Sequence, residues 1–163
     1  DLCRKLVLDL ADRIENLTII SGLAYGIDVT AQRTAYENGA KTVAVLGCGI
    51  DYCYPKEHLD LYQKLKEDGL VISEYPNKLE PQPQWFIIRN RIIAYASRAL
   101  VVISARKNSG SVTTISFATE ADREIFCCPT GIDEDSVCNE LIRDGAHIVT
   151  CGEDILYYLG LDS

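Results

Sequence analysis

Six short runs of apolar and β-branched residues recur along the chain, and stretches of helical period separate most of them. The runs do not alternate polar with apolar residues, which is typical of strands buried on both faces of a parallel sheet. An apolar residue at every fourth position from Leu2 to Ile14 predicts an opening helix. Strands that alternate with helices predict a doubly wound α/β fold with a mostly parallel sheet. The strands are expected at residues 17–20, 42–46, 70–72, 100–103, 124–128 and 147–150.

The chain opens on a predicted helix, whereas a doubly wound unit ordinarily opens on a strand in the middle of its sheet. We therefore expect one more strand upstream of residue 1. A length of 163 residues suits one hydrophobic core. The sequence thus predicts a single domain over residues 1–163, truncated at its N-terminus.

The seven cysteines are odd in number and irregularly spaced, so we expect reduced thiols rather than disulfides. His58 and His147 are the two histidines, and no Cys-x2-Cys pair occurs, so no metal site is predicted. No apolar run approaches the ~18 residues of a membrane-spanning helix. Association with a membrane is therefore not expected.

The net charge of −8 speaks against a protein that coats nucleic acid by bulk attraction. The charge is unevenly distributed, however, because residues 81–119 hold five basic side chains and no acidic one. This window carries +5, which leaves −13 on the rest of a chain whose net charge is −8. A solvated face is one interpretation of the window. A local polyanion site is the other, and the neighbouring glycines and aromatic residues favour it.

Glycine and serine follow three of the predicted strands. Ser21 and Gly22 follow the first, Gly47 follows the second, and Ser109-Gly110-Ser111 follows the fourth. Because parallel strands end at one edge of a sheet, these turns are expected to converge. Hydroxyl groups and the N–H groups of a first helical turn suit phosphate oxygens, although a tight packing turn is the alternative. The motif Gly47-x-Gly49 is not followed by the third glycine of a dinucleotide-binding fingerprint, so no cofactor is predicted.

Cations and aromatic side chains lie close to these turns in the sequence. Lys56 follows the second strand, and Phe86 offers a flat face for an unpaired base, although Phe86 or Trp85 could equally be a core residue. Arg89 and Arg91 are separated by roughly 200° around a helix. Only one of them is therefore expected to face a groove, and the other is expected to be structural.

The sequence contains no recognisable set of catalytic residues. It contains neither a Gly-x-Ser-x-Gly elbow nor a phosphate-binding loop of the Gly-x4-Gly-Lys type. Asp28 is placed in the first turn of a predicted helix, where the positive end of the helix dipole stabilises a carboxylate. A structural role is therefore expected for Asp28. The sequence predicts a binding protein rather than an enzyme. A nucleotide-binding enzyme that cleaves the base from nucleoside monophosphates and a pure oligomerisation module stay open as alternatives.

Several motifs are specific enough to indicate a family. The chain resembles the DNA-processing protein A family, also called Smf, and the likeness runs in order through nearly its whole length. The matching motifs are Ser21-Gly-Leu-Ala-Tyr-Gly-Ile-Asp28, Lys41-Thr-Val-Ala-Val-Leu-Gly-Cys-Gly-Ile-Asp51, Tyr54-Pro-Lys56, Ser73-Glu-Tyr75, Arg89-Asn-Arg-Ile-Ile-Ala94, Ser109-Gly-Ser111 and Cys138-Asn-Glu-Leu-Ile-Arg-Asp-Gly-Ala146.

The resemblance implies a Rossmann-like core in a dimeric bacterial cytoplasmic protein. Such a protein binds single-stranded DNA during natural transformation and helps to load the RecA recombinase onto it. Apolar residues implied for the dimer contact are Leu141, Ile142 and Ile148. Residues implied for the DNA groove are Ser21, Gly22, Gly47, Lys56, Phe86, Arg89, Ser109, Gly110 and Ser111.

The chain also departs from the family pattern. Family members open this domain with a strand that ends in Gly-Ser/Thr-Arg, and this chain begins after that point. Asn108 stands where the family often has Arg, and Pro83 and Gln84 leave the loop before Phe86 without a cation. Weaker DNA binding than that of the intact family members is therefore expected.

Overall fold

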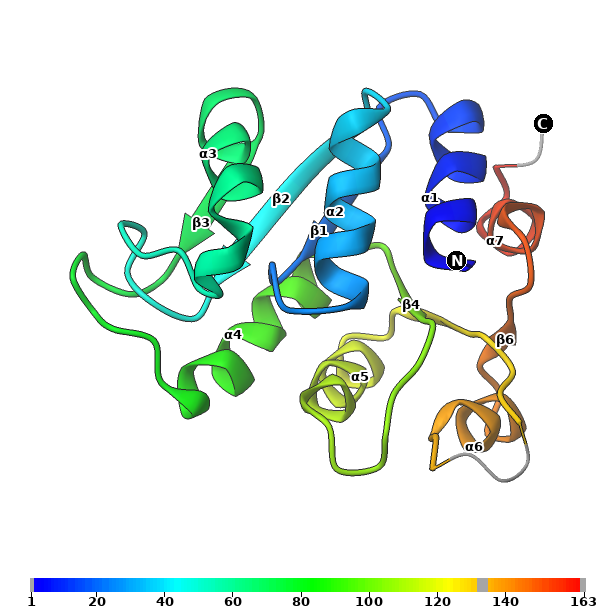
Figure 1. Ribbon diagram of the computed structural model, residues 1–163. Helices are drawn as coiled ribbons and strands as arrows, with labels where there is room; N and C mark the ends of the chain where they lie inside the picture. The colour runs from blue at the N-terminus through cyan, green and yellow to red at the C-terminus, as the bar shows by residue number, and fades with distance from the viewer. Residues whose placement is uncertain (1, 132–134, 162–163) are drawn as a thin grey trace.

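The computed structural model describes residues 2–131 and 135–161, in which helices alternate with strands (Figure 1). The amino-terminal half contains α1 (Leu2–Arg13), β1 (Thr18–Ser21), α2 (Ile27–Glu37), β2 (Lys41–Leu46), the short 3-10 helix η1 (Lys56–His58), α3 (Leu59–Asp68) and β3 (Leu70–Ser73). The carboxyl-terminal half contains α4 (Pro83–Ala96), β4 (Ala99–Val102), α5 (Gly110–Glu120), β5 (Glu124–Cys127), α6 (Cys138–Arg143), β6 (His147–Ile148) and α7 (Gly152–Leu159).

The six strands in the described residues are all parallel, as predicted, but they form two sheets rather than one. The first sheet has the order β1-β2-β3 and the second the order β4-β5-β6. In Figure 1 the first sheet lies on the left and the second on the right, with β1 and β4 nearest to each other. The doubly wound α/β prediction is confirmed, whereas the sheet is interrupted between β1 and β4.

Apolar periodicity accounts for how the two halves are joined. Leu6 and Leu10, which lie on one face of α1, enter a cluster with Phe126, Val149 and Leu156 from the second half. α1 also packs against α2 in the first half. The opening helix therefore acts as a bridge, and its burial of apolar surface favours the association of the two sheets.

Buried thiols fill part of this core. All seven cysteines are free, and those on the strands and α6 are fully enclosed. Burial raises the pKa of the Cys48 thiol to about 11 and that of Cys127 to about 12. These thiols are therefore protonated at neutral pH and behave as small apolar side chains.

None of the described helices combines the length and the apolar character needed to cross a membrane.

Candidate nucleic-acid interface

Helix α4 brings together the turns that follow the strands. It begins at Pro83, whose fixed φ and missing N–H suit the first turn of a helix. Phe86, Arg89 and Asn90 are spaced at i, i+3 and i+4, so they share one face of α4. This face is directed at the carboxyl ends of β1 and β2 and at the start of α5.

Arg89 is held beneath the turns rather than presented at the surface. It is 4% exposed. Its Nη1 donates to the Gly22 carbonyl at 3.0 Å and also to the Val45 carbonyl, and its Nε donates to Asn90 Oδ1 at 3.1 Å. Burial lowers the pKa of the Arg89 guanidinium, while the nearby Asp28 carboxylate partly offsets that effect. Arg89 therefore joins the end of β1 to the end of β2, and it is the structural member of the arginine pair.

Gly22 and Gly47 are glycines because α4 packs directly on their backbones. A Cβ at Gly22 would lie 2.5 Å from Arg89 Nη1, and a Cβ at Gly47 would lie 2.6 Å from Phe86 Cδ1. Contacts this short are strongly repulsive, so a side chain at Gly22 would displace the Arg89 guanidinium and one at Gly47 would displace the Phe86 ring. The two glycines thus allow close approach of α4, and their link to DNA is indirect.

Asn90 connects this assembly to the third turn. Its Nδ2 donates to the Gly110 carbonyl at 3.1 Å, which fixes the first turn of α5 against α4. The Ser109 hydroxyl donates to the Arg106 carbonyl at 2.8 Å and makes no capping hydrogen bond to α5. Gly110 and Ser111 are exposed at the start of the helix.

Side chains of α2 already occupy the backbone N–H groups of the turn between β1 and α2. Asp28 Oδ2 accepts from the Gly22 N–H at 3.0 Å and from the Ala24 N–H at 3.4 Å. Gln32 Oε1 accepts from the Leu23 N–H at 2.9 Å. The Asp28 carboxylate therefore stabilises the turn after β1, which agrees with the structural role expected for Asp28.

Tyr54 is a site residue that the sequence reasoning missed. Its ring stacks on Phe86 with 5.3 Å between centroids and an interplanar angle of 27°, and Tyr54 is 46% exposed. An aromatic residue in the motif Tyr54-Pro55-Lys56 could have indicated it, but only Lys56 of this motif was predicted to bind a ligand. Phe86 is half-buried between Tyr54 and the Arg89 guanidinium, which lies 5.6 Å from its ring centroid. Tyr54 is therefore the exposed face of an aromatic platform whose base is Phe86.

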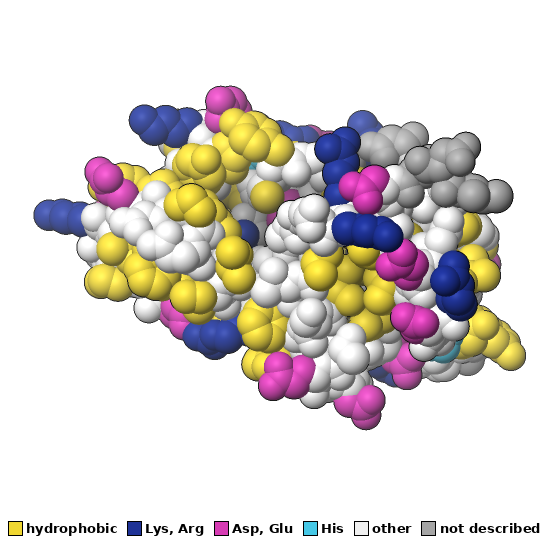
Figure 2. All heavy atoms as spheres, turned by 90° about the horizontal axis from the view of Figure 1, so that it is seen from below, with side chains coloured by type: hydrophobic (Ala, Val, Ile, Leu, Met, Phe, Trp, Pro, Cys, Tyr) yellow, Lys and Arg dark blue, Asp and Glu magenta, His cyan; other side chains and the backbone are white. Residues whose placement is uncertain are grey.

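Two cations are available to a ligand, Lys56 two residues after Tyr54 and Arg106 in the lining of the same cavity. Lys56 and Arg106 are exposed, and neither forms an ion pair within the described part of the chain. Arg91 instead pairs with Glu74, and Lys107 pairs with Glu140 at 2.8 Å. Figure 2, which views the molecule from below, shows Lys and Arg side chains interspersed with Asp and Glu and with a broad hydrophobic area. A polyanion could therefore be bound on this face only over a small area around individual cations.

A single cavity joins most of the predicted site. Its volume is about 1300 Å³, and six of the nine predicted groove residues line it together with Tyr54 and Arg106. Gly47 lies against Phe86, and Lys56 and Ser109 adjoin lining residues in the sequence. The six that line the cavity are Ser21, Gly22, Phe86, Arg89, Gly110 and Ser111.

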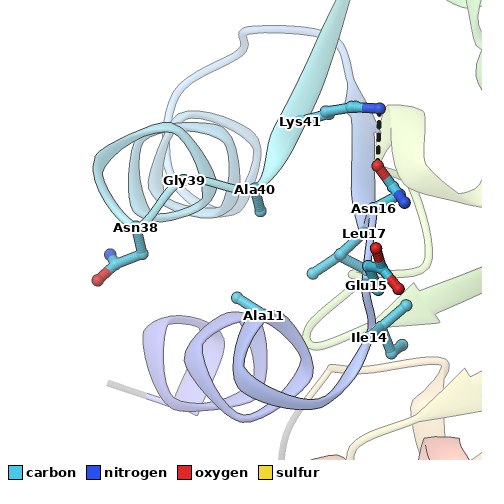
Figure 3. Close-up of a pocket in the computed structure, with 9 residues that line it drawn as sticks. All are labelled: Ala11, Ile14, Glu15, Asn16, Leu17, Asn38, Gly39, Ala40 and Lys41. Carbon is cyan, nitrogen blue, oxygen red and sulfur yellow. Dashed lines mark hydrogen bonds between the residues drawn. The ribbon is translucent and has the colours of Figure 1, made fainter.

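A second, smaller pocket lies at the opposite end of the strands (Figure 3). It has a volume of about 180 Å³, and Lys41 Nζ donates to Asn16 Oδ1 at 3.0 Å at its edge. Leu17, Ala40 and the backbone turn at Gly39 form much of the lining. This pocket offers no aromatic surface, so it is a poor candidate for nucleotide binding.

The residues expected at a dimer contact differ in exposure. Leu141 and Ile142 pack partly into the core of their own chain, whereas Ile148 is 49% exposed. Tyr158, which is 50% exposed, stacks on His147 with 3.9 Å between ring centroids. Ile148 and Tyr158 are therefore the more accessible apolar groups near β6.

The described residues form no cluster of three or more His, Cys, Asp or Glu side chains suited to a metal ion. At the carboxyl ends of β1 and β4 the cavity presents the Tyr54–Phe86 pair, the Arg106 guanidinium and the Ser111 hydroxyl, and most of its remaining lining is apolar.

Comparison with known proteins identifies the family. The family model for DNA recombination-mediator protein A matches residues 1–160. The chain belongs to this family. DNA processing protein DprA from Streptococcus pneumoniae is 42% identical over 155 residues, which cover 93% of this chain and 55% of that protein. The chain thus spans about half the length of this relative.

Solved structures of two family members share the fold. The X-ray structure of the pneumococcal protein superposes with a TM-score of 0.89 at 39% identity, over 96% of this chain and 55% of that one. The DNA processing protein A structure from Helicobacter pylori, which concerns the single-stranded DNA binding mode of that protein, gives 0.87 at 27% identity, over 98% and 73%. The molybdenum cofactor carrier protein of Chlamydomonas reinhardtii, at 15% identity and a TM-score of 0.63 over 98% and 84%, shares the Rossmann-like fold alone.

Packing at Gly47 in this family member leads to a first prediction. Replacing Gly47 with alanine is expected to lower the free energy of unfolding by about 1–3 kcal/mol, because the new Cβ would overlap Phe86. Gly110→Ala is the matched control, since a Cβ there would have no neighbour within 4 Å. Urea unfolding of both variants measures the difference, and equal stabilities would contradict the packing described here.

Proposed function

We propose that the chain binds single-stranded DNA without sequence preference at the carboxyl ends of β1, β2 and β4. The observation that supports this most strongly is the stacked Tyr54–Phe86 pair at a cavity that Arg106 also lines. Every base offers a flat face to such a platform, so stacking does not select a sequence. The single-stranded DNA binding mode of the Helicobacter pylori relative supports the same ligand.

Phosphate recognition in this proposal depends on side chains rather than on the backbone N–H groups of the turn after β1. Lys56 and Arg106 neutralise the backbone, while the exposed start of α5 offers the Ser111 hydroxyl and the positive end of the helix dipole. Arg89, which is buried, supports the platform from beneath without touching the strand. We therefore assign Arg89 a supporting role in the DNA site, in place of the direct DNA contact that the family resemblance implied.

The wider role follows the family. We place the protein in DNA processing during natural transformation, in the bacterial cytoplasm, where it would load the RecA recombinase onto incoming strands. Homodimerisation through the exposed surface near β6, with Ile148 and Tyr158 at its centre, is part of this proposal. Binding rather than catalysis is the activity we assign.

The salt dependence of binding tests the cationic part of the site. Affinity for a single-stranded oligonucleotide is expected to fall with salt, with a log–log slope of about −2 to −3 if three or four phosphates are neutralised. Lys56→Gln is expected to make this slope less steep by about 0.7, because one phosphate contact is lost. Fluorescence titration at two salt concentrations measures both values.

Lys41→Gln is the matched control for Lys56→Gln. Lys41 is an exposed lysine that opens β2 at the opposite edge of the sheet, beside Asn16. Its replacement is expected to leave the slope unchanged. A flat salt response in the unmodified protein, or tighter binding to double-stranded than to single-stranded oligonucleotide, would refute the proposed function. Release of free base from nucleoside monophosphates would favour the enzyme alternative instead.

A further inference from the structure

Tyr25 is a second exposed aromatic residue at the rim of the cavity. It follows β1 and is 62% exposed, whereas Tyr54 follows β2 and is 46% exposed. Both side chains line the same cavity. Because β1 and β2 are neighbouring parallel strands, the turns that follow them lie side by side at the carboxyl edge of the sheet. Tyr25 nevertheless has no part in the DNA site described above.

Two contacts join the turn that carries Tyr25 to the segment that follows Lys56. The Tyr25 hydroxyl donates to Glu57 Oε2 at 2.6 Å. His58 Nδ1 donates to the Leu23 carbonyl at 2.8 Å. The rings of Tyr25 and His58 also meet edge to face, with 5.1 Å between centroids and an interplanar angle of 69°. The Tyr25 ring is therefore held in one orientation beside η1.

The backbone of this turn anchors one side chain in the core and leaves the other in water. Leu23 has a φ of 59°, in the left-handed region that residues other than glycine seldom adopt, and Gly26 has a φ of 84°. Leu23 is fully buried in a cluster with Leu46 and Leu61, and this burial offsets the backbone strain. Tyr25, two residues later, stays exposed. A ring that is both fixed and exposed binds a flat ligand at a low cost in conformational entropy.

The charges around Tyr25 favour stacking over ion pairing. The hydrogen bond to Glu57 raises the pKa of Tyr25 to about 12, and the Tyr54 phenol contributes to the same shift. Tyr25 is therefore neutral at physiological pH, and the two phenols are close enough to interact. The exposed Lys56 is next to Glu57 in the sequence, so the opposite charges of these two residues offset each other locally. A ligand at Tyr25 would thus be bound mainly through the ring.

We propose that Tyr25 forms a second base subsite, on which an unpaired nucleobase stacks while another base of the same strand stacks on Tyr54. Lys56, which lies between Tyr54 and Glu57 in the sequence, neutralises a phosphate of that strand. Bases in a duplex are stacked on each other and cannot offer their faces to two separate rings. The second subsite therefore adds to the preference for single-stranded DNA. This inference rests on the proposed DNA binding and deepens it by adding Tyr25 to the site.

Affinity measurements on variants of the full chain test the second subsite. Tyr25→Ala is expected to weaken binding of a single-stranded oligodeoxyadenylate by about 5- to 150-fold, with the salt dependence retained. Tyr25→Phe keeps the ring and is expected to keep most of the affinity. Tyr157→Ala is the matched control, because Tyr157 is 68% exposed and does not line the cavity. Full affinity in Tyr25→Ala together with weakened binding in Tyr54→Ala would overturn the second subsite and leave the proposed function standing.

Fluorine NMR of protein labelled with fluorinated tyrosine gives a measurement local to each ring. The signals of Tyr25 and Tyr54 are assigned by their absence from Tyr25→Phe and Tyr54→Phe. Oligodeoxyadenylate is expected to shift both signals through the ring currents of the stacked purines. An abasic oligomer of the same length has the phosphates without the bases, so it is expected to shift neither signal in this way.

The outcomes separate the two proposals. A shift of the Tyr54 signal alone, or equal shifts of the Tyr25 signal with the abasic oligomer and with oligodeoxyadenylate, would overturn the second subsite only. Absence of DNA binding by the unmodified chain would refute the proposed function and the second subsite together. Shifts of both signals with oligodeoxyadenylate alone, together with the weakened binding of Tyr25→Ala, would support the second subsite.

Discussion

Replacing Arg89 with alanine is expected to lower the free energy of unfolding by about 3–5 kcal/mol. The substitution removes a buried side chain and leaves the carbonyls of Gly22 and Val45 without their charged donor. Hydrogen bonds to charged groups contribute about 1.5–3 kcal/mol each, and the vacated volume adds a packing cost. Urea unfolding followed by far-ultraviolet circular dichroism measures the loss.

Arg91→Ala is the matched control, since it removes the same residue type from the same helix. Arg91 is partly exposed and forms an ion pair with Glu74, so its removal is expected to cost about 0–1 kcal/mol. Arg89→Lys tests the geometry, because one ammonium cannot reproduce the fork that reaches two carbonyls. Comparable losses for Arg89→Ala and Arg91→Ala would show that Arg89 does not join β1 to β2.

Replacing Tyr54 with alanine is expected to weaken single-stranded DNA binding by about 5- to 150-fold, the equivalent of about 1–3 kcal/mol for one stacked base. Tyr54 is nearly half exposed, so the domain should remain folded. The salt dependence of binding should persist, because no phosphate contact is removed. Fluorescence titration across a range of salt concentrations separates the two effects.

Tyr157→Ala is the control for the aromatic platform. Tyr157 is 68% exposed on α7 and does not line the cavity, so its loss should leave DNA affinity unchanged. Phe86→Leu adds a second measurement, since leucine preserves apolar packing on Gly47 but removes the aromatic face beneath Tyr54. Full affinity in both Tyr54→Ala and Phe86→Leu would place the bound bases elsewhere on the molecule.

The two arginines of α4 show where sequence reasoning ended. Their separation around a helix established that Arg89 and Arg91 point in different directions, and this is a property of local geometry. Which of them is buried depends on the carbonyls of Gly22 and Val45, which lie 67 and 44 residues away in the sequence. No local pattern contains that information.

The backbone N–H groups between β1 and α2 are a second case in which the sequence predicted only part of the structure. Glycine after a strand and before a helix predicted a turn at the carboxyl edge of the sheet, and such a turn joins β1 to α2. Its Gly22, Leu23 and Ala24 N–H groups are occupied by Asp28 and Gln32, because α2 turns these side chains back over its own amino end. The type of turn was readable from the sequence, whereas the identity of its acceptor was not.

The sequence by itself determined the order and type of the elements, the parallel doubly wound arrangement and the family, because apolar periodicity and motif spacing are local properties of the chain. Only the tertiary structure decided that Arg89 is internal, that Tyr54 completes the aromatic platform, and that the sheet is interrupted between β1 and β4. Each of these depends on close packing and hydrogen bonding between segments distant in sequence, and such contacts exist only once the helices have settled against the strands.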